Sequence, residues 1–196
     1  RQEIEEEYKW DLSPLCSGKE EFYQKVNKIN DFLPKIKAFE GKLNNKEDIL
    51  AYLKLDEQFS KFVEPLALYA HLKSAEVLSD SERQEMSEKL SNILNNISVE
   101  SSFASSELNK LSNEALDDII SDKRFKDYDR TFENIKKNKK HTLSKAEEKL
   151  LSGMNFLSGF SSNMDMLSDV DMKFGNIKDS KGKLHALTHS SYSSLV

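Results

Sequence analysis

The chain has 196 residues, of which 37% are hydrophobic and 32% charged, and its formal net charge is −5. This length and apolar content support one sizeable domain or two small ones, and the acidic balance excludes a global basic field that would attract nucleic acid or anionic membranes. Six glycines and three prolines are few for a many-stranded β protein, so the predicted fold class is mainly α.

The cysteine content and the N-terminus indicate a compartment. Cys16, the lone cysteine, cannot form an intrachain disulfide, which fits a reducing compartment and predicts a cytoplasmic location. No apolar run approaches membrane-spanning length and the N-terminus is acidic where a signal peptide is basic and then apolar, so no membrane partner is expected. The sequence starts at Arg1 and stops within a pattern, which indicates a fragment.

A first helix is predicted after the opening tract. Ser17 and Glu20 have the spacing of a capping box, which marks a helix start. Pro34 is expected to bend this helix because proline lacks an amide donor, and Gly41 to end it. Apolar residues recur in steps of four and three, as on one buried helix face, at Phe22, Val26, Ile29, Leu33, Ile36 and Phe39.

Two further helices follow. One starts at Asn45, and because Pro65 interrupts its apolar stripe, either one kinked helix or two helices fit. The next starts at the capping side chains of residues 79–82 and could continue through Val99, Phe103 and Leu108. The serine-rich stretch SVESSFASSEL is interpreted as helical rather than as a linker, because its apolar residues lie one turn apart. The two stripes comprise Ile49, Leu53, Phe59, Phe62, Val63, Leu66, Tyr69, Leu72, Met86, Leu90, Ile93 and Ile97.

The stretch KKNKKHTLSKAEEKLLS admits two interpretations, an anion-binding patch or a junction between two helices. Ser112 predicts the start of a short helix, and a stripe at Phe125, Tyr128, Phe132 and Ile135 predicts the next one. Lys136, Lys137, Lys139 and Lys140 then fall in the last turn of that helix, where cations face the negative end of its dipole. Ser144 and Glu147 form a second capping box before a stripe at Leu150, Leu151, Met154 and Leu157. The junction is the favoured interpretation.

Near the C-terminus the apolar period changes from that of a helix to that of a strand. Val170, Met172 and Phe174 alternate with polar residues, Asp179-Ser180-Lys181-Gly182 is typical of a turn, and Leu184 and Ala186 keep the period of two. A β-hairpin is therefore predicted at about residues 170–187. Thr188 is expected to cap a final helix, of which residues 189–196 are the start, with Tyr192 and Leu195 facing inward.

Candidate metal-binding and catalytic residues are few. His185 and His189 have a spacing of four, but Ala186 occupies the position at which a His-Glu-x-x-His zinc motif has glutamate. Asp169, Asp171 and Lys173 fail as a calcium loop because the required glycine and glutamate are missing. No phosphate-binding loop, dinucleotide motif or nucleophile elbow occurs. We therefore assign no catalytic, cofactor-binding or metal-ligating residue.

Two other groups of residues have both a structural and a functional interpretation. Cys16 is interpreted as a packing residue, because no histidine lies near it in the sequence. The methionines and phenylalanines near the C-terminus could form an adaptable recognition surface, but core packing is the favoured interpretation. This group comprises Met154, Met164, Met166, Met172, Phe156 and Phe160.

Several short motifs, spread in order along nearly the whole chain, together resemble the N-terminal region of oligoendopeptidase F, a family of zinc metallopeptidases. The motifs are Tyr8-Lys9-Trp10-Asp11-Leu12-Ser13, Phe39-Glu40-Gly41-Lys42-Leu43, Leu68-Tyr69-Ala70, Ser102-Phe103-Ala104-Ser105-Ser106-Glu107-Leu108, His141-Thr142-Leu143-Ser144 with Glu147, Glu148, Leu150, Leu151 and Ser152, Phe174 with Ile177, Asp179 and Gly182, and Leu187-Thr188-His189 with Tyr192. Each motif alone is weakly specific for the family, whereas the whole set in this order is more specific.

The resemblance implies a cytoplasmic enzyme that hydrolyses short peptides in a zinc cleft inside a mostly helical bowl. Its His-Glu-x-x-His motif and zinc ligands belong to a later region, so no catalytic residue transfers to this chain. We expect residues 1–196 to be one noncatalytic N-terminal domain of about six to eight helices with one small β-hairpin, its helices reaching about residue 168. Its expected partners are its own C-terminal catalytic domain and short peptides.

Two alternatives to this assignment remain open. The first is a free-standing helical module that binds a partner helix through its methionine-rich region. The second, which we consider weaker, is nucleic-acid binding through Lys136–Lys140; no nucleic-acid partner is expected, and binding of this kind would be steeply salt-dependent.

Overall fold

The computed structural model describes residues 5–139, 143–154, 164, 166–188 and 191–193. These residues are mainly helical with one two-stranded antiparallel sheet near the C-terminus, which confirms the predicted fold class. The α-helices are α1 (Lys19–Ile29), α2 (Leu33–Lys37), α3 (Lys46–Glu76), α4 (Ser81–Ser101), α5 (Phe103–Lys110), α6 (Asn113–Ile120), α7 (Asp129–Asn138) and α8 (Lys145–Gly153). The strands are β1 (Asn176–Lys178) and β2 (Leu184–Ala186).

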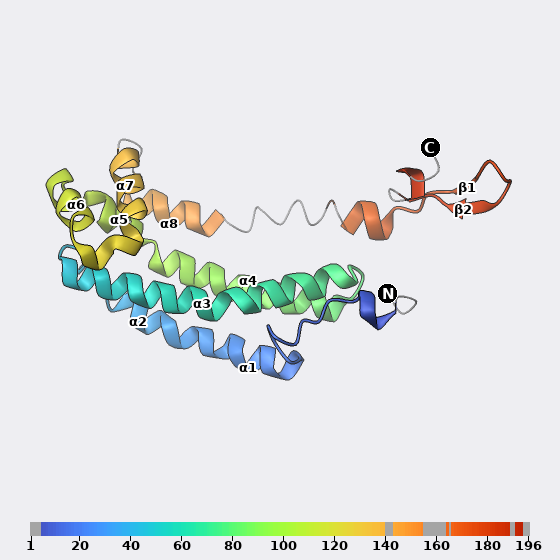
Figure 1. Cartoon of the computed structure of the whole chain (residues 1–196), viewed down its shortest axis with the longest axis horizontal. Helices are drawn as coiled ribbons and strands as arrows, with labels where there is room; N and C mark the ends of the chain where they lie inside the picture. Colours follow the sequence, from blue (N-terminus) through green and yellow to red (C-terminus); the bar gives the residue numbers. More distant parts are fainter. Residues whose placement is uncertain (1–4, 140–142, 155–163, 165, 189–190, 194–196) are drawn as a thin grey trace.

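The long helices α3 and α4 lie side by side in opposite directions and form the centre of the molecule (Figure 1). Helix α1 packs on α3, and α2 packs on both α3 and α4. Helices α5, α6 and α7 gather at one end of this pair, and α8 lies along α4 and α5.

The hydrophobic core runs from the N-terminal segment to α7. Its largest fully buried side chains include four phenylalanines, and two of them, Phe125 and Phe132, meet edge to face with ring centroids 5.7 Å apart. Phe132 is also the last buried residue of the core in the described ranges, and Ile135, partly buried, packs against it. The fully buried aromatic residues are Phe22, Phe103, Phe125 and Phe132.

Side-chain caps fix several of the predicted helix starts. Asn45 Oδ1 accepts a hydrogen bond from Asp48 N at 2.9 Å at the start of α3, and Ser112 Oγ caps α6. Ser144 and Glu147 form the predicted capping box of α8, since each side chain accepts a backbone N–H of the other residue. These local signals were correctly identified because they depend only on neighbours in the sequence.

The predicted capping box at Ser17 and Glu20 is wrong. Helix α1 starts at Lys19 after Gly18, and its N-cap makes no side-chain hydrogen bond. Ser17 instead donates both its backbone N–H and its hydroxyl to Glu21 Oε2, at 2.7 and 2.6 Å. The glutamate one residue later makes the contact because the helix starts later than the motif predicts.

The bonds that Glu21 accepts lead to a prediction about pH. Lys25 and Ser17 lower the pKa of Glu21 from 4.5 to about 2 by stabilising its charged form. Because the folded-state pKa lies below the unfolded one, this contribution to stability is present above about pH 4.5 and is lost as the pH falls toward 2. Unfolding measured from pH 6 to pH 2 should show a shallower decline for Glu21→Gln than for the unchanged chain. Equal declines would contradict this assignment.

Each proline within a predicted helix has a different effect. Pro34 lies in the first turn of α2, where proline is tolerated, and a short 3-10 helix, η2 (Asn30–Phe32), separates it from α1. The sequence predicted one helix bent at Pro34, whereas the structure has two helices separated by this turn. Pro65 lies inside one continuous helix of 31 residues, so α3 is one helix and not two. Gly41 has a φ of 80°, which favours glycine in the turn between α2 and α3.

The helix that starts at Ser81 does not continue through Leu108. It ends at Ser101, and α5 starts at Phe103. The Ser102 hydroxyl donates to the carbonyl of Val99 at 2.8 Å, a local bond that competes with helical pairing. The helical interpretation of the serine-rich stretch is otherwise confirmed, and the small side chain of Ser106 is fully buried.

The hairpin exists but is shorter than predicted. Val170 lies in a π-helical turn, Leu167–Asp171, and the paired strand starts at Asn176, opposite Ala186. Residues that alternate between apolar and polar form a strand only where a partner strand lies beside them. Here pairing stops because Thr188 N–H donates to the Ser191 hydroxyl at 2.7 Å instead.

The predicted final helix is present in part. Residues 191–193 are helical, and Thr188 Oγ1 accepts the N–H of Ser191 at 3.0 Å, as expected of a cap. Tyr192 is exposed, so the prediction that it faces inward is wrong. His189 and Leu195 lie outside the described residues.

Candidate functional site

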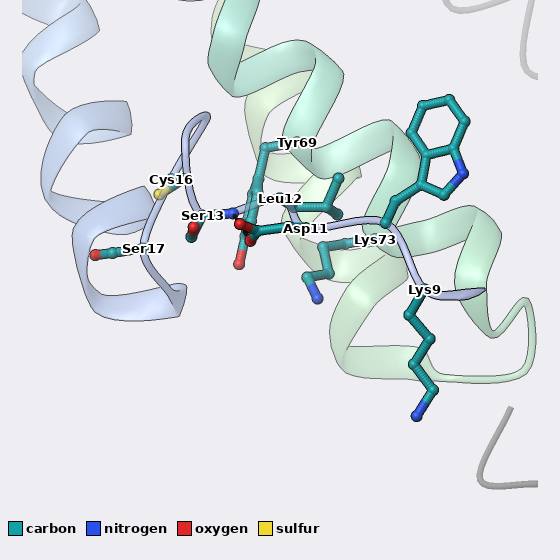
Figure 2. A pocket seen from close by; sticks show the side chains of 9 residues that line it. Lys9, Asp11, Leu12, Ser13, Cys16, Ser17, Tyr69 and Lys73 are labelled. Atoms are coloured by element: carbon teal, nitrogen blue, oxygen red, sulfur yellow. Dashed lines mark hydrogen bonds between the residues drawn. The ribbon is translucent and has the colours of Figure 1, made fainter. Parts of the chain in front are cut away.

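Two of the family-like motifs, far apart in the sequence, meet at a cavity of about 410 Å³ that we call the N-terminal cavity (Figure 2). One wall is the extended segment that precedes α1, and the other is the last turns of α3. Leu12 and Cys16 anchor the extended segment in the core. The lining residues are Lys9, Trp10, Asp11, Leu12, Ser13, Cys16, Ser17, Tyr69 and Lys73.

Tyr69 is the most buried polar side chain of this cavity. Its residue surface is 5% exposed, and its ring packs against Phe22 with centroids 5.9 Å apart. Figure 2 shows its hydroxyl on the same side as the carboxylate of Asp11. The hydroxyl is not among the buried side-chain atoms that lack a partner in the described part of the chain, so it reaches solvent through the cavity. Burial raises the pKa of Tyr69, so the hydroxyl stays protonated and can donate.

Charges of both signs surround this hydroxyl. Lys73 Nζ lies 5.9 Å from the centroid of the Tyr69 ring and 3.5 Å from Glu76 Oε2. Lys9 also lines the cavity, and Figure 2 shows its ammonium group pointing away from the Tyr69 hydroxyl. Asp11 Oδ1 accepts the N–H of Ser13 at 2.9 Å, and this bond lowers the pKa of Asp11, so the carboxylate is charged at neutral pH.

Cys16 lies on the buried side of the cavity. Its side chain is buried, and its thiol donates to the carbonyl of Gly18 at 3.2 Å. This contact supports the packing role expected from the sequence.

A second pair of family-like motifs meets at Glu107. Its Oε1 accepts the N–H of Gly41 at 2.8 Å, and its Oε2 accepts the N–H of Leu43 at 3.2 Å. Glu107 thus fixes the loop between α2 and α3 to α5. This arrangement satisfies two loop donors with one carboxylate, so its role is to hold the fold.

The lysine-rich stretch contributes to a junction of helices. Lys136 and Lys137 lie in the last turn of α7, as predicted. Lys136 pairs with Asp117 at 2.5 Å, and Lys139 donates to the carbonyl of Leu111. Lys140 lies outside the described residues. Since these lysines bind groups of the same chain, the geometry favours the junction over an anion-binding patch.

The histidine considered for zinc has a local partner. His185 on β2 lies with Nε2 2.8 Å from Asp179 Oδ2, and Asp179 Oδ1 accepts the N–H groups of Lys181 and Lys183. These bonds lower the pKa of Asp179 and shape the hairpin turn, in which Gly182 has a φ of 78°. No cluster of three or more His, Cys, Asp or Glu side chains suited to a metal occurs in the described ranges.

Large apolar side chains remain on the surface of the C-terminal third, and we call them the exposed apolar set. Leu150 on α8 is 67% exposed. The prediction that the methionines here fill a core is wrong for Met154, Met164 and Met172, which all belong to the set. Phe156, Phe160 and Leu157 lie outside the described residues. The full set is Leu143, Leu150, Leu151, Met154, Met164, Leu167, Met172, Phe174, Leu184 and Tyr192.

Sequence reasoning did not single out Tyr69, Lys73 or Glu107 as polar groups of interest. Tyr69 was assigned to an apolar stripe and to a motif, and Glu107 only to a motif. The signal that could have found them is the ordered set of motifs, because motifs 50 to 60 residues apart meet in space.

Comparisons with known proteins agree with the motifs. Residues 107–174 match the Peptidase_M3_N family, described as oligopeptidase F. Group B oligopeptidase PepB of Streptococcus agalactiae is 29% identical over all of this chain and 33% of the relative. Oligopeptidase PepF of Bacillus subtilis is 26% identical over 98% of this chain and 29% of the relative.

The crystal structure of oligoendopeptidase-F from Enterococcus faecium has a similar fold. Its TM-score is 0.79 at 22% identity, over 90% of this chain and 35% of that chain. The chain thus spans about a third of the length of the curated relatives that it matches. No helix among the described residues is both long and apolar enough to cross a membrane. By these matches, the chain is related to the N-terminal region of the oligoendopeptidase F family.

Proposed function

We propose that this chain is the noncatalytic N-terminal domain of a zinc metallopeptidase that hydrolyses short peptides in the cytoplasm. Residues 1–196 form one domain in this proposal, and the catalytic domain lies outside it. The domain forms one wall of the substrate cleft and excludes folded proteins, so that unstructured peptides enter. The observation that carries the proposal is that nearly the whole chain aligns with about a third of the length of each of two curated oligopeptidases.

The exposed apolar set supports a large partner on the C-terminal third. Between residues 11 and 142, Leu68 is the one large hydrophobic residue that the described part of the chain leaves exposed, whereas the C-terminal third carries ten. Large apolar side chains exposed in this number favour an interaction surface. A two-stranded hairpin such as β1–β2 is also marginally stable by itself. Because the relative is about three times longer than this chain, the proposed partner for this surface is the remaining part of the enzyme.

The described residues do not fit a zinc site, because no suitable cluster of ligands lies among them. Zinc and its ligands are therefore assigned to the catalytic domain, where the metal would activate water for peptide hydrolysis. The role of the present chain is to bind that domain and to limit access to it.

A turnover assay tests the noncatalytic assignment. The 196-residue chain is incubated with a quenched fluorescent peptide, with and without added zinc. We expect no cleavage under either condition, because no cluster of ligands suited to a metal lies among the described residues. Turnover that depends on zinc and copurifies with the chain would refute the assignment.

A second experiment tests the docking surface in the longer protein. Leu150→Asp combined with Leu151→Asp should lower its peptidase activity at least about tenfold, because two charges are placed in an apolar interface. The same change at Leu68, an exposed leucine on α3, is the matched control and should leave activity within about twofold. Equal losses in both variants would mean that the set has no special role.

The exposed methionines also favour the alternative of a free-standing interaction module. Methionine side chains adapt to different partner surfaces, and Met154, Met164 and Met172 are all exposed. The two functions differ in the gene: a reading frame that continues into a His-Glu-x-x-His motif supports the peptidase domain, and a stop codon soon after Val196 supports the module.

A further inference from the structure

The register of the β1–β2 hairpin determines which backbone groups of β1 face away from β2. The N–H of Leu187 donates to the carbonyl of Gly175 at 3.2 Å, so these residues form a hydrogen-bonded pair of the ladder. Such pairs recur at every second residue of an antiparallel ladder, and the next one joins Ile177 to His185. The backbone N–H and C=O groups of Asn176, which lies between the two pairs, therefore point outward.

The outward edge of β1 is open. The same alternation directs the backbone groups of Lys178 outward, and no hydrogen bond in the described part of the chain uses the backbone of Asn176 or Lys178. The edge of β2 is partly closed, because the carbonyl of Ala186 accepts the Ser191 hydroxyl at 2.8 Å. An added strand would therefore lie along β1, where it could bond to the outward groups of both residues.

The charge of the hairpin indicates which strand fits this edge. The side chains of Lys178, Lys181 and Lys183 are exposed, and none of them makes an ion pair within the described ranges. Asp179 is the only acidic residue from 172 to 188, and it already bonds to His185 and to two N–H groups of the turn. Opposite charges on neighbouring strands attract, whereas a second copy of this edge would bring lysines together. The favoured partner is therefore an acidic strand.

We propose that the outward edge of β1 binds short acidic peptides in an extended conformation, as a third strand. The peptide backbone bonds to Asn176 and Lys178, and a peptide carboxylate lies opposite the Lys178 ammonium group. Further acidic side chains approach Lys181 and Lys183 at the turn. The proposal rests on the proposed function for its ligand class, since short peptides are the expected substrates, but the binding itself requires neither zinc nor a catalytic domain.

Fluorescence anisotropy with labelled pentapeptides and the 196-residue chain tests the site. The probe alternates glutamate and valine. One control alternates lysine and valine, and the other is the acidic probe with all of its backbone amides N-methylated, which removes its donors but keeps its charge. We expect saturable binding of the probe that weakens with added salt, and at least about tenfold weaker binding of each control.

Two variants of β1 test the two kinds of contact. Asn176→Pro removes an outward N–H that the hairpin does not use, and should weaken binding of the acidic probe at least about tenfold. Lys178→Glu leaves the backbone unchanged and should weaken it at least about fivefold. The matched control is Ala186→Pro, which removes an outward N–H from the other edge and should leave affinity within about twofold.

Binding that is weakened by Asn176→Pro and Lys178→Glu but kept in Ala186→Pro would support the site. The absence of binding to the unchanged chain, equal affinity for the N-methylated probe, or equal losses in the two proline variants would overturn it. These titrations measure binding without cleavage, so their failure is distinct from a failure of the turnover assay, which tests the noncatalytic assignment.

Discussion

Phe103→Ala is expected to lower the free energy of unfolding by about 3–5 kcal/mol, the usual cost of removing a large aromatic residue from a packed core. Phe103 is 2% exposed and meets Tyr52 edge to face with ring centroids 6.2 Å apart. Tyr52 in turn contacts Phe39 at 5.7 Å. The cavity would therefore lie where α5, α3 and the segment after α2 meet, and the surrounding side chains could fill it only in part.

Denaturant unfolding followed by circular dichroism measures this loss. Phe174→Ala is the matched control, because Phe174 is 43% exposed and belongs to the exposed apolar set. It should change stability of the 196-residue chain by less than about 0.5 kcal/mol. A large loss at Phe174 with a small one at Phe103 would show that the core has been placed wrongly.

Glu107→Ala is expected to cost about 2–3 kcal/mol of stability. The substitution leaves the N–H groups of Gly41 and Leu43 without their acceptor, and bonds to a charged group contribute about 1.5–3 kcal/mol each before water replaces them. The same unfolding measurement applies, with hydrogen exchange of the Gly41 and Leu43 amides as a local readout. Both amides should exchange faster in the variant.

Two further variants refine this test. Glu107→Gln keeps one acceptor oxygen and should lose less stability than Glu107→Ala. Glu133→Ala removes an exposed glutamate on α7 that lies 4.0 Å from Lys137, and should cost less than about 0.5 kcal/mol. If Glu107→Ala is no worse than Glu133→Ala, the carboxylate does not hold the loop.

The fold from α1 to α7 was largely predictable because its signals are local or periodic. Buried residues such as Val26, Leu66 and Leu90 repeat at helical spacing, and capping residues such as Asn45 and Ser112 mark helix starts. Boundaries were less certain. Helix α1 starts later than predicted, and Glu21 rather than Glu20 contacts Ser17. Which glutamate makes this contact depends on where the backbone first becomes helical.

The C-terminal third was harder to predict because periodicity says which side of a helix is apolar but not what covers it. Leu150, Leu151 and Met154 have the spacing of a buried stripe, and yet all three are exposed. Likewise, the alternation at Met172 and Phe174 could not show that the ladder between β1 and β2 starts only at Asn176.

The candidate site could be predicted only as a set of motifs. Asp11 and Tyr69 lie 58 residues apart in the sequence, and their meeting depends on how the segment before α1 crosses the end of α3. The sequence shows neither that the Tyr69 ring is buried nor that its hydroxyl faces the cavity. These properties arise from tertiary packing, which side-chain spacing along one helix does not report.

Pro65 determines where the longest helix of the molecule can flex. Helix α3 spans about 46 Å at 1.5 Å per residue, and connects the N-terminal cavity at its last turns to α6 at its first turn, where Lys46 pairs with Asp118. Since Pro65 has no N–H to donate to the carbonyl of Lys61, one backbone hydrogen bond is missing near the middle of this helix. Any change of angle between the two halves of the domain is therefore expected to concentrate at the turn from Lys61 to Pro65.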